Sequence, residues 1–208
     1  MTTPEEFWSK AAPRYAKMPV RNIDAYKRTL ARTRNYLSPG DHALEVGCGT
    51  GGTARELAPN LGHITATDIA PEMIRIAQER ARDEGVTNAT FVAADIADSP
   101  AGPFDVVLAH NLLHLVPDTQ AALADLRDRL KPGGVFISKT VCLGQPGLNW
   151  KIRLVLKALP LLQWLGKAPR LQRLSGAEIE AMITDAGFEV LEAVTDPETS
   201  RYIVARKT

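Results

Sequence analysis

Short apolar runs and longer stretches with helical spacing alternate along most of the chain. The runs predict buried strands at residues 42–46, 64–67, 90–93, 105–109, 135–140, 188–193 and 202–205. The spaced stretches predict helices at residues 53–59, 71–84, 118–130 and 175–187. Repeated alternation of strands with helix-length segments predicts a doubly wound, mostly parallel α/β sheet with helices on both faces.

Residues 5–36 precede the first strand and have apolar positions at helical spacing. Pro13 and Pro19 interrupt this spacing, which predicts two helices joined by a loop near residues 17–22. The segment is either a packing arm or a lid, because a segment rich in Trp, Tyr and Arg ahead of a core can close over a site. Of these two alternatives, an N-terminal helical lid is the prediction for residues 1–36.

Residues 141–174 break the alternation of strands and helices. Leucines and tryptophans are interleaved there with lysines and arginines, and Pro146, Pro160 and Pro169 are expected to prevent one long helix. The segment is either a helical packing layer or a helical substrate cap with an apolar wall and a cationic rim. Regular structure returns at Ser175, which has Glu178 three residues on, the spacing of a capping box.

With 208 residues the chain is long enough for one domain with a full core. Its 25 basic and 24 acidic residues give a net charge of +1, but the charges are unevenly placed. Residues 129–177 hold nine basic residues and no acidic one. Such a one-signed segment indicates an anionic ligand or partner, including peripheral contact of residues 141–174 with an anionic membrane.

The first residues lack the apolar core of a signal peptide, and no apolar run reaches the roughly 18 residues that a membrane span needs. The two cysteines, Cys48 and Cys142, have neither disulfide nor zinc-site spacing. A reduced, cytoplasmic setting without a metal site is therefore expected.

Glycines cluster at residues 47–52, between the first predicted strand and the helix that follows it. Glycine permits backbone angles that side chains forbid, and the free N–H groups at a helix start favour anionic or polar ligand groups. The loop is therefore expected to bind a nucleotide-type cofactor. Gly47-x-Gly49-x-x-Gly52 also fits the dinucleotide fingerprint, with Asp68 about 20 residues beyond it, so NAD is one candidate.

Four further features favour another cofactor. Glu45 lies two residues before the first glycine, where it could pair with a cationic amino group, and Asp95 ends the third strand. The turn at residues 130–134 leads into the fifth strand, and a helix and two strands close the chain at residues 179–205.

Taken together, these residues resemble the class I S-adenosylmethionine-dependent methyltransferases. Residues 45–51 are similar to the first motif of that family, Asp68 to its ribose-binding acid, and Asp95 with Ile96 to its adenine contact. Residues 104–107 followed by 113–114 are similar to its fourth-strand motif, and residues 130–134 to the signature after it. The resemblance is nearest to the ubiquinone/menaquinone C-methyltransferases and the bacterial phospholipid N-methyltransferases.

The resemblance implies a Rossmann-like, seven-stranded sheet whose last strand, residues 202–205, is antiparallel to the rest. It implies residues 37–208 as the methyltransferase domain, with S-adenosylmethionine as cofactor and S-adenosylhomocysteine as product. The cofactor contacts that it implies are Glu45, Gly47, Gly49, Thr50, Gly51, Asp68, Ile69, Met73, Asp95, Ile96, His110 and Tyr15.

A sulfonium cofactor is already activated, so the protein has mainly to align the reactants and exclude water. A general base is needed only if the acceptor holds its proton. His110 and His114 follow the fourth strand and are the candidate catalytic bases, because an exposed imidazole titrates near neutrality. The alternatives are a cofactor contact for His110 and a structural role for His114, while Tyr15 and Tyr26 are weaker candidates. The expected acceptor is a small lipophilic or anionic molecule, such as a phenol, a quinone or a lipid.

Two other classes of function are considered. An NAD-dependent oxidoreductase would need a catalytic pair such as Tyr-x-x-x-Lys, which the chain lacks. A non-catalytic cofactor-binding protein would act through residues 141–174 as an interaction surface. Nucleic acid is a disfavoured partner, because residues 110–113 read His-Asn-Leu-Leu where base-amine methyltransferases carry Asn/Asp-Pro-Pro-aromatic.

Overall fold

The computed structural model describes residues 2–145, 148–197 and 199–208, so the expectation for Pro146 lies outside the described residues. Seven strands form one sheet in the order β3-β2-β1-β4-β5-β7-β6. The strands are β1 (His42–Val46), β2 (His63–Asp68), β3 (Ala89–Ala93), β4 (Phe104–His110), β5 (Leu130–Val141), β6 (Phe188–Thr195) and β7 (Ser200–Lys207).

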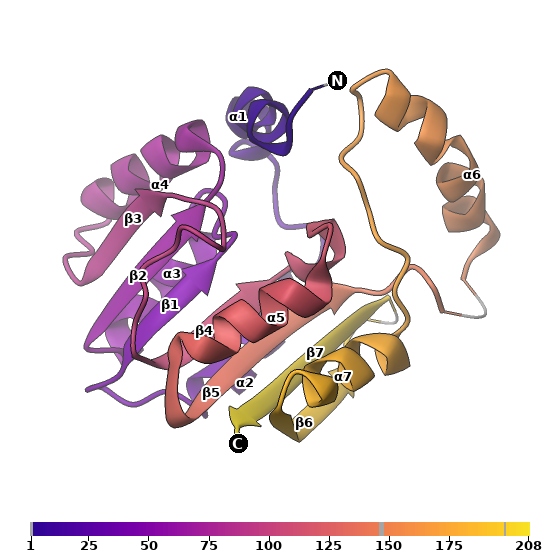
Figure 1. Cartoon of the computed structure of the whole chain (residues 1–208). Helices are drawn as coiled ribbons and strands as arrows, with labels where there is room; N and C mark the ends of the chain where they lie inside the picture. The colour runs from indigo at the N-terminus through magenta and orange to yellow at the C-terminus, as the bar shows by residue number, and fades with distance from the viewer. Residues whose placement is uncertain (1, 146–147, 198) are drawn as a thin grey trace.

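The pairs among β1 to β5 are parallel, and β7 is antiparallel to both β5 and β6. The predicted Rossmann-like sheet with an antiparallel last strand is therefore confirmed. Its order reverses at β1, where β2 lies on one side and β4 on the other (Figure 1). In open sheets of this kind, ligands bind outside the carboxyl ends of the strands at such a switch point.

Helices cover both faces of the sheet (Figure 1). On one face α2 (Ile23–Arg34), α3 (Gly52–Leu57) and α4 (Pro71–Asp83) pack on alternate strand residues such as Leu108 and Ile137. The other face is covered by α5 (Thr119–Asp128) and α7 (Gly176–Asp185), which pack on the intervening residues such as Val107 and Phe136. Short 3₁₀ turns, η1 (Ala58–Asn60) and η2 (Leu113–Leu115), follow α3 and β4.

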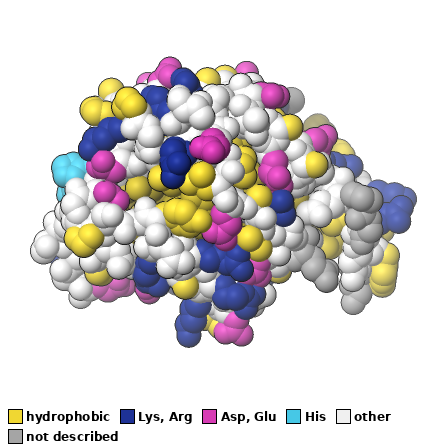
Figure 2. Space-filling model, turned by 90° about the horizontal axis from the view of Figure 1, so that it is seen from below, with side chains coloured by type: hydrophobic (Ala, Val, Ile, Leu, Met, Phe, Trp, Pro, Cys, Tyr) yellow, Lys and Arg dark blue, Asp and Glu magenta, His cyan; other side chains and the backbone are white. Residues whose placement is uncertain are grey.

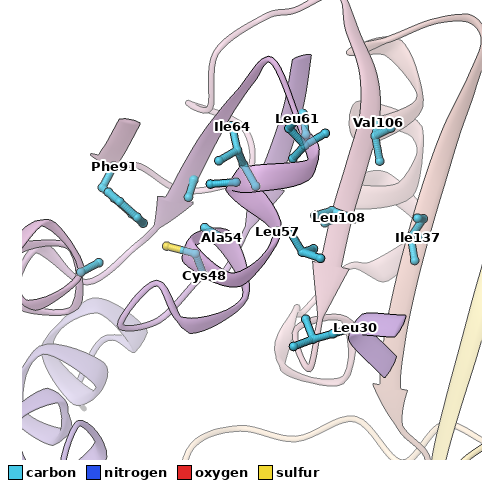
Figure 3. Packing of buried hydrophobic residues seen from close by; sticks show 14 of the residues in the cluster. Leu30, Cys48, Ala54, Leu57, Leu61, Ile64, Phe91, Val106, Leu108 and Ile137 are labelled. Carbon is cyan, nitrogen blue, oxygen red and sulfur yellow. The ribbon is translucent and has the colours of Figure 1, made fainter. Parts of the chain in front are cut away.

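The first of these cores surrounds the glycine loop. Figure 3 shows Leu57 of α3 close to Leu108 of β4, with Leu30 of α2 below them and Ile137 of β5 to their right, all in one core cluster. The sulfur of Cys48 lies near Ala54 in the same view. Hence the loop is attached to a packed core, and α2 is part of that core.

The N-terminal segment forms two helices, α1 (Pro4–Tyr15) and α2, joined at residues 16–22 as predicted. Pro13 was expected to interrupt the pattern but lies inside α1. Pro13 has no N–H to donate to the carbonyl group of Ser9, four residues earlier, but α1 continues for two more residues to Tyr15. Ala12 of α1 packs against Met73 and Ile76 of α4.

The second helix is fixed to the far edge of the sheet by ion pairs. Arg28 binds both carboxylate oxygens of Asp196, at 2.7 and 2.8 Å, and Arg32 lies 3.1 Å from Glu192. These pairs join the basic N-terminal segment to the acidic C-terminal one, so part of the charge asymmetry along the chain is neutralised in space. Figure 2, which views the molecule from below, shows basic side chains (dark blue) and acidic side chains (magenta) interspersed on the face turned to the viewer.

Residues 131–134, which were expected to form a turn before the fifth strand, belong to the strand itself. Phe104 pairs with Leu130 and Val106 pairs with Val135, so β5 advances by five residues where β4 advances by two. Gly133 adopts a φ of 72° in this bulge. The strand therefore begins earlier than its apolar run, because a bulge tolerates the Pro and Gly residues that a regular strand excludes.

The insertion forms α6 (Trp150–Trp164), which continues through Pro160, although Pro160 was expected to interrupt a helix there. Proline has no N–H, so the carbonyl group of Leu156, four residues earlier, loses its helical partner. The guanidinium group of Arg173 donates to that oxygen at 2.8 Å and replaces the lost bond. Figure 1 shows α6 standing away from the sheet. Within the part of the chain that the structure describes, no helix is long and apolar enough to cross a membrane.

Candidate functional site

The glycine loop joins β1 to α3 and is held by backbone bonds. Cys48 N–H donates to the carbonyl oxygen of Thr67 at 2.9 Å, which fastens the loop to β2. Gly47, Gly49 and Gly51 have φ values of 66°, 54° and 73°, in the left-handed region that favours glycine. The backbone path by itself therefore already requires glycine at these three positions, as the sequence predicted.

The three glycines differ in what lies beside them. A Cβ atom on Gly47 would lie 2.6 Å from Leu112, and one on Gly51 would lie 2.7 Å from Phe91. At Gly49 the nearest atom would be Tyr15 Cε1, at 3.7 Å. Packing thus opposes side chains at Gly47 and Gly51, whereas a Cβ atom on Gly49 would make only ordinary van der Waals contact with Tyr15, across a space that Gly49 lines.

That space is a cavity of about 1410 Å³ at the carboxyl ends of β1, β2, β4 and β5, closed on one side by α1 and α2. It is larger than the roughly 300–1,000 Å³ of a usual small-molecule pocket, so it has room for a cofactor and a second molecule. The residues predicted for cofactor binding line it, with the exception of Gly51: they are Glu45, Gly47, Gly49, Thr50, Asp68, Ile69, Met73, Asp95, Ile96, His110 and Tyr15. Gly51 instead packs behind the loop.

Glu45 is the last residue but one of β1 and is only 2% exposed. Burial raises the pKa of Glu45 to about 8, a hydrogen bond from the Ala54 backbone lowers it, and Asp68 raises it further. Within the described chain its Oε2 atom has no hydrogen-bond partner. A buried carboxyl group with an open oxygen suits a cationic partner, so the site fits a cofactor that carries an ammonium group.

Asp68 ends β2 and accepts two backbone hydrogen bonds. Its Oδ2 atom accepts from Gly49 N–H at 2.8 Å, and its Oδ1 atom accepts from Ala70 N–H at 2.9 Å, at the start of α4. Burial raises the pKa of Asp68, and these two bonds lower it. Each carboxylate oxygen has a second lone pair, so Asp68 can shape the loop and still accept bonds from a ligand.

Asp95 was expected to end the third strand but lies two residues after β3. It is exposed, and its Oδ1 atom accepts from the neighbouring Ile96 N–H at 2.7 Å. Ile96 is buried. Both line the cavity beyond the end of β3, on the side of β1 away from β4. The residues expected for one cofactor thus lie together over β1, β2 and β3.

α1 covers this end of the cavity. Tyr15 lines it, and partial burial, with the charges of Asp68 and Glu45, raises the pKa of the Tyr15 hydroxyl. Arg80 of α4 donates to the carbonyl oxygen of Ala16 at 2.5 Å and to Thr50 Oγ1 at 3.2 Å. Arg80 therefore connects the end of α1 to the glycine loop.

The two predicted histidines have different positions. His110 is the last residue of β4 and lines the cavity, whereas His114 lies in η2 and is not among the lining residues. Both are buried, and burial lowers the pKa of each to about 4, aided at His110 by the charge of Lys139. The expected exposed imidazole near neutrality is therefore wrong: both rings are neutral at pH 7.

Sequence reasoning missed Lys139. It is 8% exposed, lines the cavity, and pairs in register with His110 across β4 and β5. Its Nζ atom donates to Thr29 Oγ1 of α2 at 2.7 Å. The available signal was a lysine inside the apolar run of residues 135–140, where a central strand is expected to be buried on both faces.

The cysteines and the metal-ligating side chains provide no further candidate site among the described residues. Both thiols are free and buried, and burial raises the pKa of each. Cys48 packs as a small apolar side chain in the core of Figure 3. Across the described ranges, no three His, Cys, Asp or Glu side chains lie close enough together to hold a metal ion.

Known proteins resemble this chain in both sequence and structure. A family model described as a methyltransferase domain matches residues 44–136. The chain is 32% identical over 178 residues to the reducing polyketide synthase Preu2 of Preussia isomera, an alignment that covers 80% of this chain and 7% of that protein. It is 30% identical over 137 residues to a ubiquinone biosynthesis O-methyltransferase of Xanthomonas euvesicatoria, covering 65% of this chain and 56% of that one.

A solved structure has the same fold. The SAM-dependent methyltransferase from Aquifex aeolicus superposes with a TM-score of 0.72 at 19% identity, over 97% of this chain and 98% of that one. The chain belongs to the class I S-adenosylmethionine-dependent methyltransferases, a family whose cofactor is S-adenosylmethionine. That membership sets aside the dinucleotide interpretation of residues 47–52. The chain spans less than two thirds of the length of the two curated relatives.

Proposed function

We propose that the protein transfers a methyl group from S-adenosylmethionine to a small acceptor that is lipophilic or carries an anionic oxygen, as phenols, quinones and lipid-like molecules do. One observation carries this proposal. The cavity continues past the residues of β1 to β3 that are expected to hold the cofactor, along β4 and β5. Lys139 and Val141 line it there, together with His110, which is also a predicted cofactor contact. A second molecule at that end would lie beside the cofactor in the same enclosure.

The residues over β1 to β3 would hold the cofactor. Glu45 would bind the amino group, the backbone at Gly49 would lie against the methionine part, and Asp68 would accept the ribose hydroxyls. Asp95 would bind the adenine amino group. Ile69, Met73 and Ile96 would supply the apolar surface for the ring. When bound, the sulfonium supplies an activated methyl group for an in-line displacement.

His110 would assist an acceptor that still carries its proton. Because burial lowers its pKa to about 4, the imidazole is free to accept a hydrogen bond or a proton at neutral pH. Its Nε2 atom has no partner among the residues described. An acceptor that is already an anion would need no base.

The two N-terminal helices would have separate roles in enclosing the site. α2 is a fixed wall, because Arg28 and Arg32 tie it to the edge of the sheet. α1 is the candidate lid. The insertion reaches it from the other side: a Cβ atom on Gly166 would lie 3.3 Å from Thr2 Oγ1. The end of α6 and the start of α1 thus meet, and residues 141–174 would complete the cap.

We also propose that α6 contacts an anionic membrane surface, from which a lipophilic acceptor could enter. Two exposed tryptophans, Trp150 at 68% and Trp164 at 78%, lie at its ends, with exposed Leu154 and Leu161 between them. Basic residues accompany them, and residues 129–177 contain no acid. Exposed apolar residues with a cationic surround favour anionic lipid.

The membrane contact is tested with vesicles of anionic and of neutral lipid. The protein is expected to bind the anionic vesicles, and Leu161→Ser with Trp164→Ser to weaken that binding. Leu191→Ser, which alters an exposed leucine of β6, serves as the matched control. Absence of binding to the anionic vesicles, or equal loss in the control, would refute the membrane contact.

The methyl transfer is tested by calorimetry with S-adenosylmethionine, S-adenosylhomocysteine and NAD. Product formation is then measured with phenols, quinones and fatty acids. Binding of the first two ligands and methylation of at least one acceptor class are expected. Binding of NAD without response to the methyl donor would overturn the proposal. Binding of the methyl donor with no acceptor methylated would favour the non-catalytic interpretation.

A further inference from the structure

The ammonium group of Lys139 is placed where a protein seldom leaves a lone cation. The residue lies near the carboxyl end of β5, is 8% exposed and faces the cavity. Its one hydrogen-bond partner in the described structure is a neutral hydroxyl, Thr29 Oγ1, at 2.7 Å. An ammonium group has three donors, and a buried cation is costly unless an anion or further acceptors accompany it.

The carboxylates nearby do not fill this role. Asp196, whose charge acts on Lys139, already accepts both of its close contacts from Arg28. No ion pair to Lys139 occurs in the described parts of the chain. The groups that act on Lys139 are therefore Thr29 and Arg28 from α2, His110 from β4 and Asp196 from the turn before β7.

His110 lies beside Lys139 on the same face of the sheet. Leu108 and Ile137, two residues before them on β4 and β5, lie near Leu30 of α2 in Figure 3. Side chains alternate between the two faces of a strand, so His110 and Lys139 also lie toward α2. The ammonium group of Lys139 and the neutral imidazole of His110 thus lie together on β4 and β5, beyond the residues of β1 to β3 that are expected to hold the cofactor.

We infer that Lys139 and His110 form a binding site for an anionic oxygen of the methyl acceptor, a carboxylate or a phenolate. Lys139 would supply the charge, because it lines the cavity and its ammonium group has donors that Thr29 does not use. His110 would accept a hydrogen bond from a neighbouring hydroxyl group. This inference rests on the proposed function and narrows it: acidic acceptors would be chosen over neutral ones of the same shape.

The test measures equilibrium binding to the protein saturated with S-adenosylhomocysteine. Benzoate is compared with benzamide, and 4-nitrophenol with 4-nitroanisole, so that each anion has a neutral partner of similar size. Lys139→Met removes the charge and keeps the length of the side chain. Thr29→Val removes the hydrogen bond from Lys139 but leaves the charge, so it controls for a purely structural tie between α2 and β5.

We expect the wild-type protein to bind benzoate roughly tenfold or more tightly than benzamide, the range for a charge-assisted hydrogen bond. Bound 4-nitrophenol should shift toward its phenolate, which is visible in its absorption spectrum. Lys139→Met should abolish both effects, and Thr29→Val should retain the preference for benzoate. An effect with only one of the two anions still supports the site and identifies the oxygen that it takes.

The inference is overturned if the wild-type protein prefers neither anion, or if Lys139→Met keeps the preference. It is also overturned if Thr29→Val and Lys139→Met lose the preference equally, since the lysine would then act only as a tie. Affinity for S-adenosylhomocysteine, measured on each variant, separates this failure from failure of the proposed function. Loss of cofactor binding with a retained anion preference would count against the proposed methyl transfer, but not against the anion-binding site.

Discussion

The backbone N–H of Gly49 donates a 2.8 Å hydrogen bond to the carboxylate of Asp68. Gly49 follows β1 and Asp68 ends the neighbouring strand β2. The other oxygen of Asp68 accepts from Ala70 N–H at the start of α4. One carboxylate therefore links the glycine loop after β1 to the helix after β2. The residue expected to bind the ribose also fixes the shape of the loop against which the cofactor would lie.

Replacement of Asp68 by asparagine is expected to lower both stability and cofactor affinity. An amide has one acceptor oxygen, so either Gly49 or Ala70 loses its partner, at a cost of about 1–3 kcal/mol for a buried N–H. The melting temperature should fall by several degrees, at roughly 2–4 °C per kcal/mol for a chain of this size. Affinity for S-adenosylhomocysteine, measured by calorimetry, should fall roughly tenfold or more.

Asp95→Asn is the control, because that carboxylate is exposed and its one hydrogen bond within the described residues comes from the neighbouring Ile96 N–H. Its melting temperature should stay close to that of the wild-type protein. Equal destabilisation of the two variants would show that the link between the loop and α4 contributes nothing particular.

Glu45 predicts that cofactor binding releases a proton. Its pKa is about 8 without a ligand, so the carboxyl group is mostly protonated at pH 7. An ammonium group beside it would favour the carboxylate and lower that pKa. Affinity for S-adenosylhomocysteine should therefore rise by up to roughly tenfold between pH 6 and 7. Calorimetry in buffers of different ionisation enthalpy counts the protons, and a count near zero would contradict the pairing with Glu45.

The raised pKa of the Glu45 carboxyl group also predicts how the free energy of unfolding depends on pH. A carboxyl pKa raised from 4.5 to about 8 means that the folded chain holds the proton more tightly than the unfolded chain. Glu45 therefore lowers the free energy of unfolding as pH rises from about 4.5 to 8, and adds no further loss above. Glu45→Gln removes this loss, so the variant should gain more stability at pH 8 than at pH 5. The difference should be roughly 1.4 kcal/mol per unit of pKa shift, read from urea unfolding.

The parts of the fold that the sequence predicted well are those set by neighbouring residues. The apolar run at residues 42–46 is β1 with the same bounds, because a central parallel strand is buried on both faces. The glycines at 47, 49 and 51 all have the left-handed backbone for which glycine is needed. The capping box of Ser175 and Glu178 is present, since it needs only residues three apart.

The parts that were missed depend on partners far along the chain. Pro160 stays inside a helix because Arg173 supplies the donor that proline lacks. His110 and Lys139 are buried at the ends of β4 and β5, where α2 contacts Lys139 through Thr29. The apolar run around Lys139 indicates its burial, but the contact with α2 depends on a residue more than 100 positions away. The acceptor end of the site is therefore harder to predict from sequence than the cofactor end, whose motif is continuous.

Replacement of His110 is expected to affect activity, whereas replacement of His114 is expected to affect stability. His110→Gln should lower kcat roughly 10²-fold or more with a phenolic acceptor that still carries its proton, if the imidazole acts as a base. His114→Gln should mainly lower the melting temperature, because His114 is buried and lies off the cavity. With a pKa of about 4, His110 should add no inflection to kcat between pH 5.5 and 7.5 at saturating cofactor. An inflection near 6.5 that disappears in His110→Gln would contradict this assignment.

Alanine substitutions at Gly51 and Gly133 distinguish the cost of backbone strain from the cost of steric overlap. Their φ values are 73° and 72°, so alanine meets the same unfavourable backbone at both, at roughly 1–2 kcal/mol. At Gly133 a Cβ atom would have no neighbour within 4 Å, whereas at Gly51 it would lie 2.7 Å from Phe91 and 2.9 Å from Ala77. Gly51→Ala should therefore lose about 1–3 kcal/mol more in free energy of unfolding than Gly133→Ala, which is the cost of overpacking. Urea unfolding of the two variants measures the difference, and equal losses would mean that α4 and β3 shift to accommodate the methyl group. In that case Gly51 would be required only for its backbone angle.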